Sequence, residues 1–271
     1  MSDYLFVHGG SHGAWCWEGV IRELDRGGLR GLALDLPGGG ADSTPRASVT
    51  FDSYTAAVNA FIAGNDLRDL VLVGHSLAGI ILPDIAAANR ERIREVVFIA
   101  AYILDRGERA IDLVAPGRVP EYYRLAETSA EYSLMLPYEI ARQRFFSDLG
   151  EADARAAYAR LTPQPFAPYL SPARYGARTI GAISRYVICR DDRNLPADLC
   201  RRWAAKLGGT VQEIEAGHDV MLSKPAELAA LLSLSGTAGR MIPRSGRVGA
   251  GLDAGDPQSR PGATSISGFS R

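Results

Sequence analysis

The strongest structural signal in the 271-residue chain is the stretch Leu70-Val71-Leu72-Val73-Gly74-His75-Ser76-Leu77-Ala78-Gly79. Its four leading apolar residues predict a buried strand, and apolar residues at three- and four-residue spacing over 77–88 predict a helix. A serine between such elements occupies a sharp, strained turn that exposes its hydroxyl. Gly74 and Ala78 are small enough for strand and helix to pass closely. The context favours a nucleophilic Ser76 over a purely structural turn serine.

On both sides of this stretch, short apolar runs alternate with amphipathic segments of helical length. This alternation is typical of βαβ units and predicts an α/β fold with a mostly parallel, six-stranded sheet flanked by helices. Strands are expected at residues 4–7, 30–35, 70–73, 95–100, 185–189 and 210–214. Crossover helices are expected at residues 17–24, 51–63, 77–88, 196–207 and 225–232.

The alternation is interrupted over residues 105–172, where helical segments rich in Tyr, Arg and Pro follow one another without an intervening strand. Because core strands resume afterwards, this segment is interpreted as a helical cap inserted into a core of residues 1–104 and 173–234. From residue 235 the composition changes to Gly, Ser, Arg and Pro, which cannot offset the entropy cost of folding. Residues 235–271 are therefore predicted to be a disordered tail.

The charge balance, the cysteines and the first residues of the chain indicate which partners and which cellular compartment to expect. The 31 acidic and 30 basic residues nearly cancel, so the sequence gives no reason to expect a nucleic acid or an anionic membrane as a partner. Cys16, Cys189 and Cys200 are too few and too scattered for a disulfide framework, and no CxxC pair indicates a metal site. The chain runs from its first residues straight into a strand, without a leader or an 18-residue apolar run, which predicts a cytoplasmic protein.

A serine hydroxyl needs a base that accepts its proton. Of the four histidines, His8 and His12 lie in the first loop, and His75 adjoins the nucleophile, where its side chain should point away from the serine. His218 directly follows the last predicted strand, at the carboxyl edge of the sheet where catalytic groups gather. His218 is therefore the predicted general base, and a surface-loop histidine is the alternative.

The acid that orients the base should follow the preceding strand, because this fold places its residues in the chain order serine, acid, histidine. Two adjacent carboxylates, Asp191 and Asp192, stand there. Only one of them can face His218 while the other is solvated. Asp192 is the predicted acid and Asp191 the reserve.

Attack on an ester places negative charge on the carbonyl oxygen, which preorganised backbone amides can stabilise. The Leu77 amide lies at the start of the helix after the nucleophile, where the helix dipole also favours negative charge. The second predicted donor is the Gly10 amide, in the glycine-rich loop after the first strand. This loop lacks the GxGxxG spacing and the GxxxxGK lysine, which argues against a phosphate cradle.

Five stretches of the chain form a combination of motifs: Phe6-Val7-His8-Gly9-Gly10-Ser11-His12-Gly13-Ala14-Trp15, Leu34-Asp35-Leu36-Pro37-Gly38-Gly39-Gly40, Gly74-His75-Ser76-Leu77, Tyr186-Val187-Ile188-Cys189-Arg190-Asp191-Asp192 and Gly217-His218. Together they resemble the plant methylesterase and hydroxynitrile lyase family of α/β hydrolases, which includes salicylate-binding esterases and bacterial relatives. The resemblance covers about residues 3–233 and implies the α/β-hydrolase fold.

Position by position, the resemblance implies Ser76 as nucleophile, Asp192 as acid and His218 as base, with oxyanion amides at Gly10 and Leu77. No cofactor and no metal are expected in such a triad hydrolase.

Two positions separate the branches of this family. The lyases typically carry a threonine after the first-loop histidine and a lysine after the catalytic histidine, where it stabilises departing cyanide. This chain has Gly9 and Asp219 there. A carboxylate beside a site that must stabilise an anion opposes it, which favours the esterase branch. Asp219 also departs from the hydrophobic residue common among the esterases.

The predicted function is hydrolysis of a small-alcohol ester of an aromatic or hydrophobic acid through an acyl-enzyme. The aromatic side chains of the expected cap favour an acid of this kind. The sequence leaves homodimer formation open. Alternatives on the same fold are a lyase, a C–C bond hydrolase or a tailoring step in secondary metabolism. A ligand-binding receptor and a cofactor-independent oxygenase that uses only the His–Asp pair are further alternatives, since a fold does not fix a function.

Overall fold

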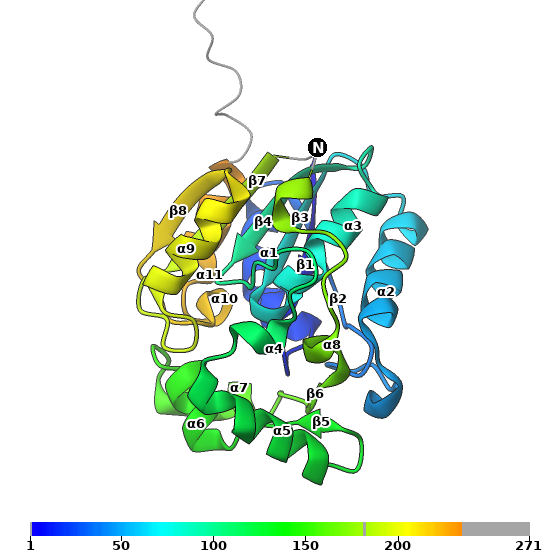
Figure 1. The fold of residues 1–271 in the computed structure, drawn as a ribbon. Coiled ribbons are helices and arrows are strands. Elements are labelled where there is room, and N and C mark those ends of the chain that lie inside the picture. Colours follow the sequence, from blue (N-terminus) through cyan, green and yellow to red (C-terminus); the bar gives the residue numbers. More distant parts are fainter. Residues whose placement is uncertain (1, 181–182, 235–271) are drawn as a thin grey trace, which may run out of the picture. The chain divides into compact units, whose positions relative to one another are not determined.

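Six parallel strands form the main sheet of the computed structural model, which describes residues 2–180 and 183–234. Their order is β2-β1-β3-β4-β7-β8, and Figure 1 shows helices on both faces. The predicted fold class is confirmed. The strands are β1 (Asp3–Val7), β2 (Arg30–Leu34), β3 (Leu70–His75), β4 (Ile93–Ile99), β7 (Ile183–Cys189) and β8 (Thr210–Ile214).

The central strand β3 is buried on both sides, which explains its continuous apolar sequence. Leu70 and Leu72 belong to the core cluster on one face of the sheet. Val71 and Val73 belong to the cluster on the other face, because successive side chains of a strand point in opposite directions. All four side chains are fully buried, so the strand that leads into Ser76 is rigidly held.

The flanking helices lie close to their predicted positions. Helix α2 begins after Thr50, which forms a capping box with Ser53. The predicted helix over 77–88 is divided into a 3-10 turn, η3 (Ser76–Ile80), and α3, because Pro83 lacks an N–H and favours a first helical turn. The flanking helices are α1 (Glu18–Arg26), α2 (Phe51–Gly64), α3 (Leu82–Ala88), α9 (Ala197–Leu207), α10 (Val220–Ser223) and α11 (Pro225–Ser233).

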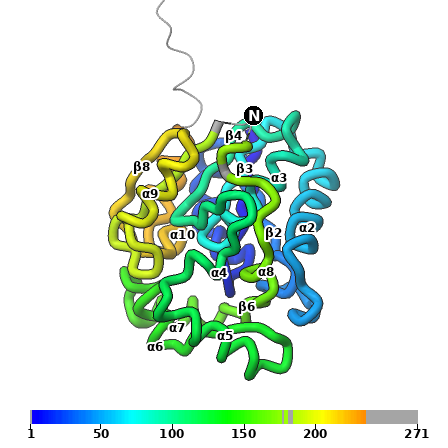
Figure 2. The backbone as a smooth tube through the Cα atoms, in the orientation of Figure 1, coloured from blue at the N-terminus to red at the C-terminus, as the bar shows by residue number. Residues whose placement is uncertain are grey.

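Between β4 and β7 the chain forms short helices that lie together at one end of the sheet (Figures 1 and 2). This segment also contains two strands, β5 (Ser133–Leu134) and β6 (Gln164–Pro165), which pair antiparallel. The expectation that no strand interrupts the segment was wrong, since two-residue strands are too short to give a periodic signal. The helices are α4 (Ala110–Leu113), α5 (Val119–Thr128), α6 (Tyr138–Arg144), α7 (Glu151–Tyr158) and α8 (Ala167–Leu170).

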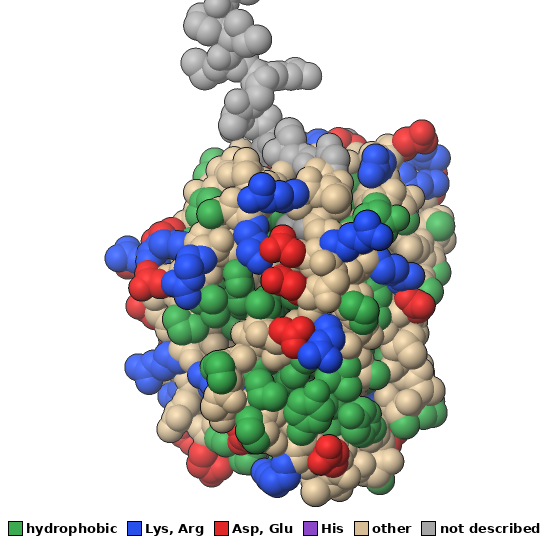
Figure 3. Space-filling view, in the orientation of Figure 1, with side chains coloured by type: hydrophobic (Ala, Val, Ile, Leu, Met, Phe, Trp, Pro, Cys, Tyr) green, Lys and Arg blue, Asp and Glu red, His purple; other side chains and the backbone are tan. Residues whose placement is uncertain are grey.

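The surface of the described part of the chain carries charges of both signs. Figure 3 shows acidic and basic side chains interspersed on the visible face, with hydrophobic side chains gathered between them. Among residues 2–180 and 183–234, no helix has the length and apolar character needed to cross a bilayer. The predicted disordered tail, residues 235–271, lies outside the described residues.

Candidate active site

Ser76 stands at a strained turn between β3 and η3. Its φ is 52°, in the left-handed region that side chains other than glycine rarely adopt. A Cβ added to Gly74 would lie 2.7 Å from a Leu82 methyl group, and one added to Gly79 would lie 2.2 Å from the Tyr102 carbonyl oxygen. The contact at Gly74 brings β3 and α3 as close as the small-residue pattern predicts, and Gly79 packs against the loop after β4.

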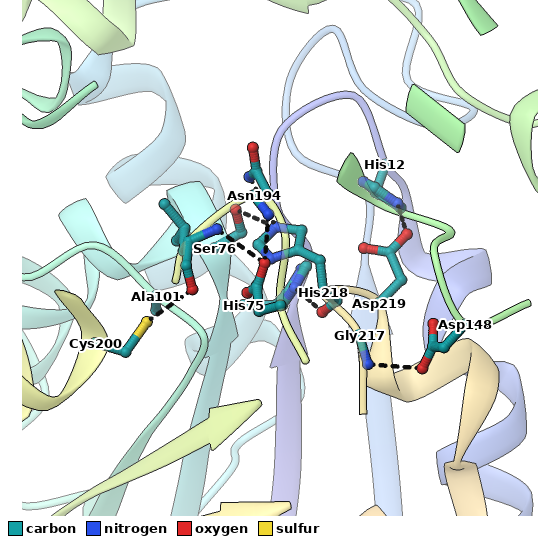
Figure 4. A network of polar contacts seen from close by, with 12 residues as sticks. His12, His75, Ser76, Ala101, Asp148, Asn194, Cys200, Gly217, His218 and Asp219 are labelled. Carbon is teal, nitrogen blue, oxygen red and sulfur yellow. Dashed lines mark hydrogen bonds and ion pairs between the residues drawn. The ribbon is translucent and has the colours of Figure 1, made fainter. Parts of the chain in front are cut away.

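Ser76, His218 and Asp192 form a hydrogen-bonded chain although they are widely separated in sequence. The Ser76 hydroxyl lies 3.0 Å from His218 Nε2, and His218 Nδ1 lies 2.7 Å from Asp192 Oδ2. All three side chains are buried. The loops that follow β3, β7 and β8 place them together at one edge of the sheet, where Figure 4 shows the His218 ring beside Ser76.

The structure distinguishes the two candidate acids. Asp191 is exposed, whereas Asp192 is only 6% exposed and points at the imidazole. The other oxygen of Asp192 accepts hydrogen bonds from the backbone N–H groups of Asn194 and Leu195, at 2.7 and 2.8 Å. These donors hold the buried carboxylate in one orientation and stabilise its negative charge.

The surroundings of His218 favour its protonated form. Burial alone lowers the pKa of an imidazole, but the carboxylate of Asp192 outweighs it, and Asp219 adds to the effect. The pKa of His218 therefore lies above its ordinary value of 6.5. A base of this kind can accept a proton from a serine hydroxyl and remain stabilised as an imidazolium.

Asn194 contacts the catalytic base, a contact that the sequence did not predict. Its side-chain nitrogen lies 3.3 Å from His218 Nε2, the same atom that faces the Ser76 hydroxyl. The guanidinium of Arg118 donates to the Asn194 carbonyl and side-chain oxygens, at 3.2 and 3.3 Å. Asn194 lies two residues after the predicted acid, and this closeness in sequence was the signal that could have placed it in the site.

A second buried histidine–aspartate pair lies beside the triad (Figure 4). His12 Nε2 is 2.8 Å from Asp219 Oδ2, and its Nδ1 is 2.8 Å from the Gly10 carbonyl oxygen. Both side chains of the pair are essentially fully buried. The pair therefore connects the loop after β1 to the loop that carries His218. Sequence reasoning placed Asp219 near the site but did not predict its contact with His12.

The loop expected to supply an oxyanion donor lies against the nucleophile. A Cβ added to Gly10 would be 3.5 Å from the Leu77 side chain, so the two predicted donor residues are neighbours. The next residue, Ser11, has a φ of 66°, and its N–H donates to Gln164 Oε1 at 3.1 Å. These contacts fix the loop, and the roles of the Gly10 and Leu77 amides remain a proposal.

His75 lies beside the general base, His218, and does not act as a base itself. Its Nε2 donates to the His218 carbonyl oxygen at 3.0 Å, and its ring centroid is 4.6 Å from that of His218. Burial, together with the neighbouring His218, holds the pKa of His75 well below its ordinary value. The neutral ring therefore packs under the catalytic histidine.

The position after the first-loop histidine has no room for a side chain. A Cβ on Gly9 would lie 2.9 Å from both the Ser76 Cβ and His75 Nδ1. A larger residue at this position would require Ser76 or His75 to shift.

His75, His218 and Asp219 also offer ligand-type atoms within 4.8 Å of one another. Both nitrogens of His218 already face partners, Ser76 and Asp192, and a metal ion would need one of these nitrogens. The group therefore fits a serine triad with its supporting residues better than a metal centre.

Comparison with known proteins agrees with this geometry. A model of the alpha/beta hydrolase family matches residues 4–231. The chain belongs to this family. The carbendazim hydrolyzing esterase of Nocardioides sp. (strain SG-4G) is 26% identical to this α/β hydrolase over 246 residues, which cover 87% of the chain and 100% of that relative.

Methylesterase 7 of Arabidopsis thaliana is 26% identical, over 84% of this chain and 94% of its own. One similar solved structure is an extracellular alpha/beta-hydrolase from a Paenibacillus species, described as sharing structural and functional homology with tobacco salicylic acid binding protein 2. It has a TM-score of 0.81 at 22% identity and covers 88% of this chain and 100% of its own, which shows the fold. The predicted resemblance is confirmed, and this α/β hydrolase is an esterase-type enzyme.

Proposed function

We propose that this α/β hydrolase cleaves small-alcohol esters of aromatic or hydrophobic carboxylic acids through an acyl-enzyme on Ser76. The observation that carries the proposal is the continuous hydrogen-bonded chain from the Ser76 hydroxyl through His218 to the buried Asp192. Relatives named as methylesterases support methanol as the leaving alcohol.

In the first half of the reaction, Ser76 Oγ attacks the ester carbonyl carbon while His218 Nε2 takes the hydroxyl proton. The carbonyl oxygen becomes negatively charged, and the Gly10 and Leu77 amides are the proposed donors to it. When the tetrahedral intermediate collapses, His218 passes its proton to the alkoxide. An alcohol leaves, and the acyl group stays on Ser76.

In the second half, a water molecule takes the place of the alcohol. His218 removes one proton from the water as it attacks the acyl carbon, and then returns a proton to Ser76 Oγ. The carboxylic acid leaves, and the enzyme is restored. The net reaction consumes one ester and one water and releases one acid and one alcohol.

The catalytic cavity must widen for this reaction. It has a volume of about 20 Å³, which is enough for about one water molecule. Aromatic side chains of the predicted cap, among them Tyr122 and Phe145, line it. We infer that substrate entry requires these side chains to move away from Ser76.

A substrate panel tests the reaction type. Methyl and p-nitrophenyl esters of benzoic and acetic acids, aromatic cyanohydrins and 1,3-diketones are assayed side by side with the purified protein. Measurable alcohol or p-nitrophenol release, with no cyanide release above background, is the expected result. Faster turnover of cyanohydrins or diketones than of every ester would contradict the proposal.

The pH dependence tests the role of His218. Only its neutral form can accept the serine proton, and its pKa is raised above 6.5. The value of kcat/KM should therefore fall as the pH decreases, with a midpoint above pH 6.5. Asp219→Asn removes one carboxylate that raises this pKa, so the midpoint should move to lower pH. An unmoved midpoint in this variant would contradict the electrostatic role of Asp219.

A further inference from the structure

A larger pocket adjoins the catalytic cavity and has no assigned role. It has a volume of about 470 Å³ and lies between the segment 112–118 and the start of α9. Tyr102, Tyr122 and Asn194 line both spaces, so the two adjoin at these side chains. A pocket of this volume suits a small organic molecule, which the catalytic cavity does not.

The wall of this pocket carries two arginines, Arg118 and Arg202. Within residues 2–180 and 183–234, neither arginine forms an ion pair with a carboxylate. The half-buried Arg118 guanidinium instead donates to neutral oxygens of Asn194. A partly buried guanidinium without a carboxylate partner is well suited to an anionic ligand group.

The two acidic residues of the same wall are engaged elsewhere. Arg109 holds Asp112 with two hydrogen bonds, at 2.7 and 3.0 Å. Asp198 is 2.6 Å from Arg201, a neighbour on α9 that does not line the pocket. Both carboxylates therefore pair with an arginine outside the pocket, Arg201 being shared with Glu213, whereas Arg118 and Arg202 pair with no carboxylate among the described residues.

The rest of the wall is apolar and aromatic. Tyr102 and Trp203 lie with ring centroids 5.3 Å apart, and Leu195 and Val114 are buried beside the same space. Aromatic rings prefer such surroundings, because tilted and offset ring contacts add to the burial of apolar area. The wall therefore combines an aromatic slot with cations.

We propose that this pocket binds a carboxylate-bearing aromatic acyl group, so that the preferred substrates are monoesters of aromatic dicarboxylic acids. The proposal rests on the function proposed above for Ser76. The ester carbonyl enters the catalytic cavity, and the aromatic ring passes the Tyr102–Tyr122 boundary. The free carboxylate then meets Arg118 and Arg202. Hydrolysis converts the monoester and water into the dicarboxylic acid and the alcohol.

The proposed pocket is connected to the catalytic base, His218, by a chain of contacts that begins at Arg118. This guanidinium holds Asn194, whose side-chain nitrogen is 3.3 Å from His218 Nε2. Only one terminal nitrogen of Arg118 donates to Asn194, so the other N–H groups of this guanidinium can bind a carboxylate while Asn194 stays in place.

The first test compares two esters of the same shape. Monomethyl terephthalate carries a carboxylate opposite the methyl ester, and methyl 4-nitrobenzoate carries a neutral nitro group there. Arg202→Gln should lower kcat/KM for the anionic ester by about tenfold, chiefly through KM. The loss for the neutral ester should be at least about fivefold smaller, because it has no charge to lose. Arg124→Gln is the control, because Arg124 is an exposed arginine on α5 that does not line the pocket, and it should leave both values within about twofold.

The second test needs no turnover. Calorimetry measures the affinity of monomethyl terephthalate for the Ser76→Ala variant, with and without Arg202→Gln. About tenfold weaker binding in the double variant, and weaker binding at higher salt, support the pocket assignment even if no ester is hydrolysed. Absence of turnover for every ester would overturn the Ser76 function alone. Equal losses on both esters, or unchanged affinity in the double variant, would overturn the anion-binding pocket alone.

Discussion

Ser76→Ala should lower the kcat for ester hydrolysis by roughly 10⁴- to 10⁶-fold, because the reaction begins with attack by the Ser76 hydroxyl on the ester carbonyl. The remaining oxyanion donors and the substrate pocket leave a small residual rate over water. The measurement is p-nitrophenyl acetate turnover with the uncatalysed rate subtracted.

Alanine and serine differ by one hydroxyl and tolerate the left-handed backbone at position 76 about equally, so the variant should keep its fold. Circular dichroism and the melting temperature provide the control. A well-folded Ser76→Ala protein with undiminished turnover would exclude this residue as the nucleophile.

Asp192→Asn should lower kcat by about 10⁴-fold while largely preserving the fold. The asparagine oxygen can still accept from the Asn194 and Leu195 amides, but its NH₂ group would donate to His218 Nδ1. The proton of His218 would then sit on Nε2, where it cannot accept the proton of Ser76. The measurement is kcat for the same ester at the pH optimum.

The neighbouring Asp191→Asn is a matched control, because Asp191 is exposed and does not face the imidazole. Its kcat should stay within about twofold of the parent protein. A larger loss in Asp191→Asn than in Asp192→Asn would reverse the assignment of the two carboxylates.

The sheet and its helices could be predicted because their signals are local. Continuous apolar runs such as residues 70–73 indicate strands that are buried on both faces, and the structure places all six strands at the predicted positions. The short strands β5 and β6 were missed, since a two-residue pairing depends on the partner strand and leaves no period in the sequence.

The site was predicted as far as chain order and motif could determine it. Ser76, Asp192 and His218 follow the order of the fold, and the structure brings them within hydrogen-bond distance. The roles of Asn194 and of the His12–Asp219 pair depend on contacts between distant loops. No single segment of sequence carries that information.

The structure also decided questions that the sequence left open. Burial separated Asp192 from Asp191, and close packing around Gly9 explained why a side chain is absent there. A cytoplasmic location, homodimer formation and a cap that includes all of residues 105–172 stay predictions from the sequence.

Active-site labelling followed by peptide mapping tests the central assignment most directly. Trypsin releases residues 69–90 as one peptide, in which Ser76 is the only residue that bears a hydroxyl group. A fluorophosphonate probe should add its mass to this peptide in the native protein and not after heat denaturation. A modified peptide elsewhere in the chain, or labelling at the same rate before and after denaturation, would contradict the assignment of Ser76 as the activated nucleophile.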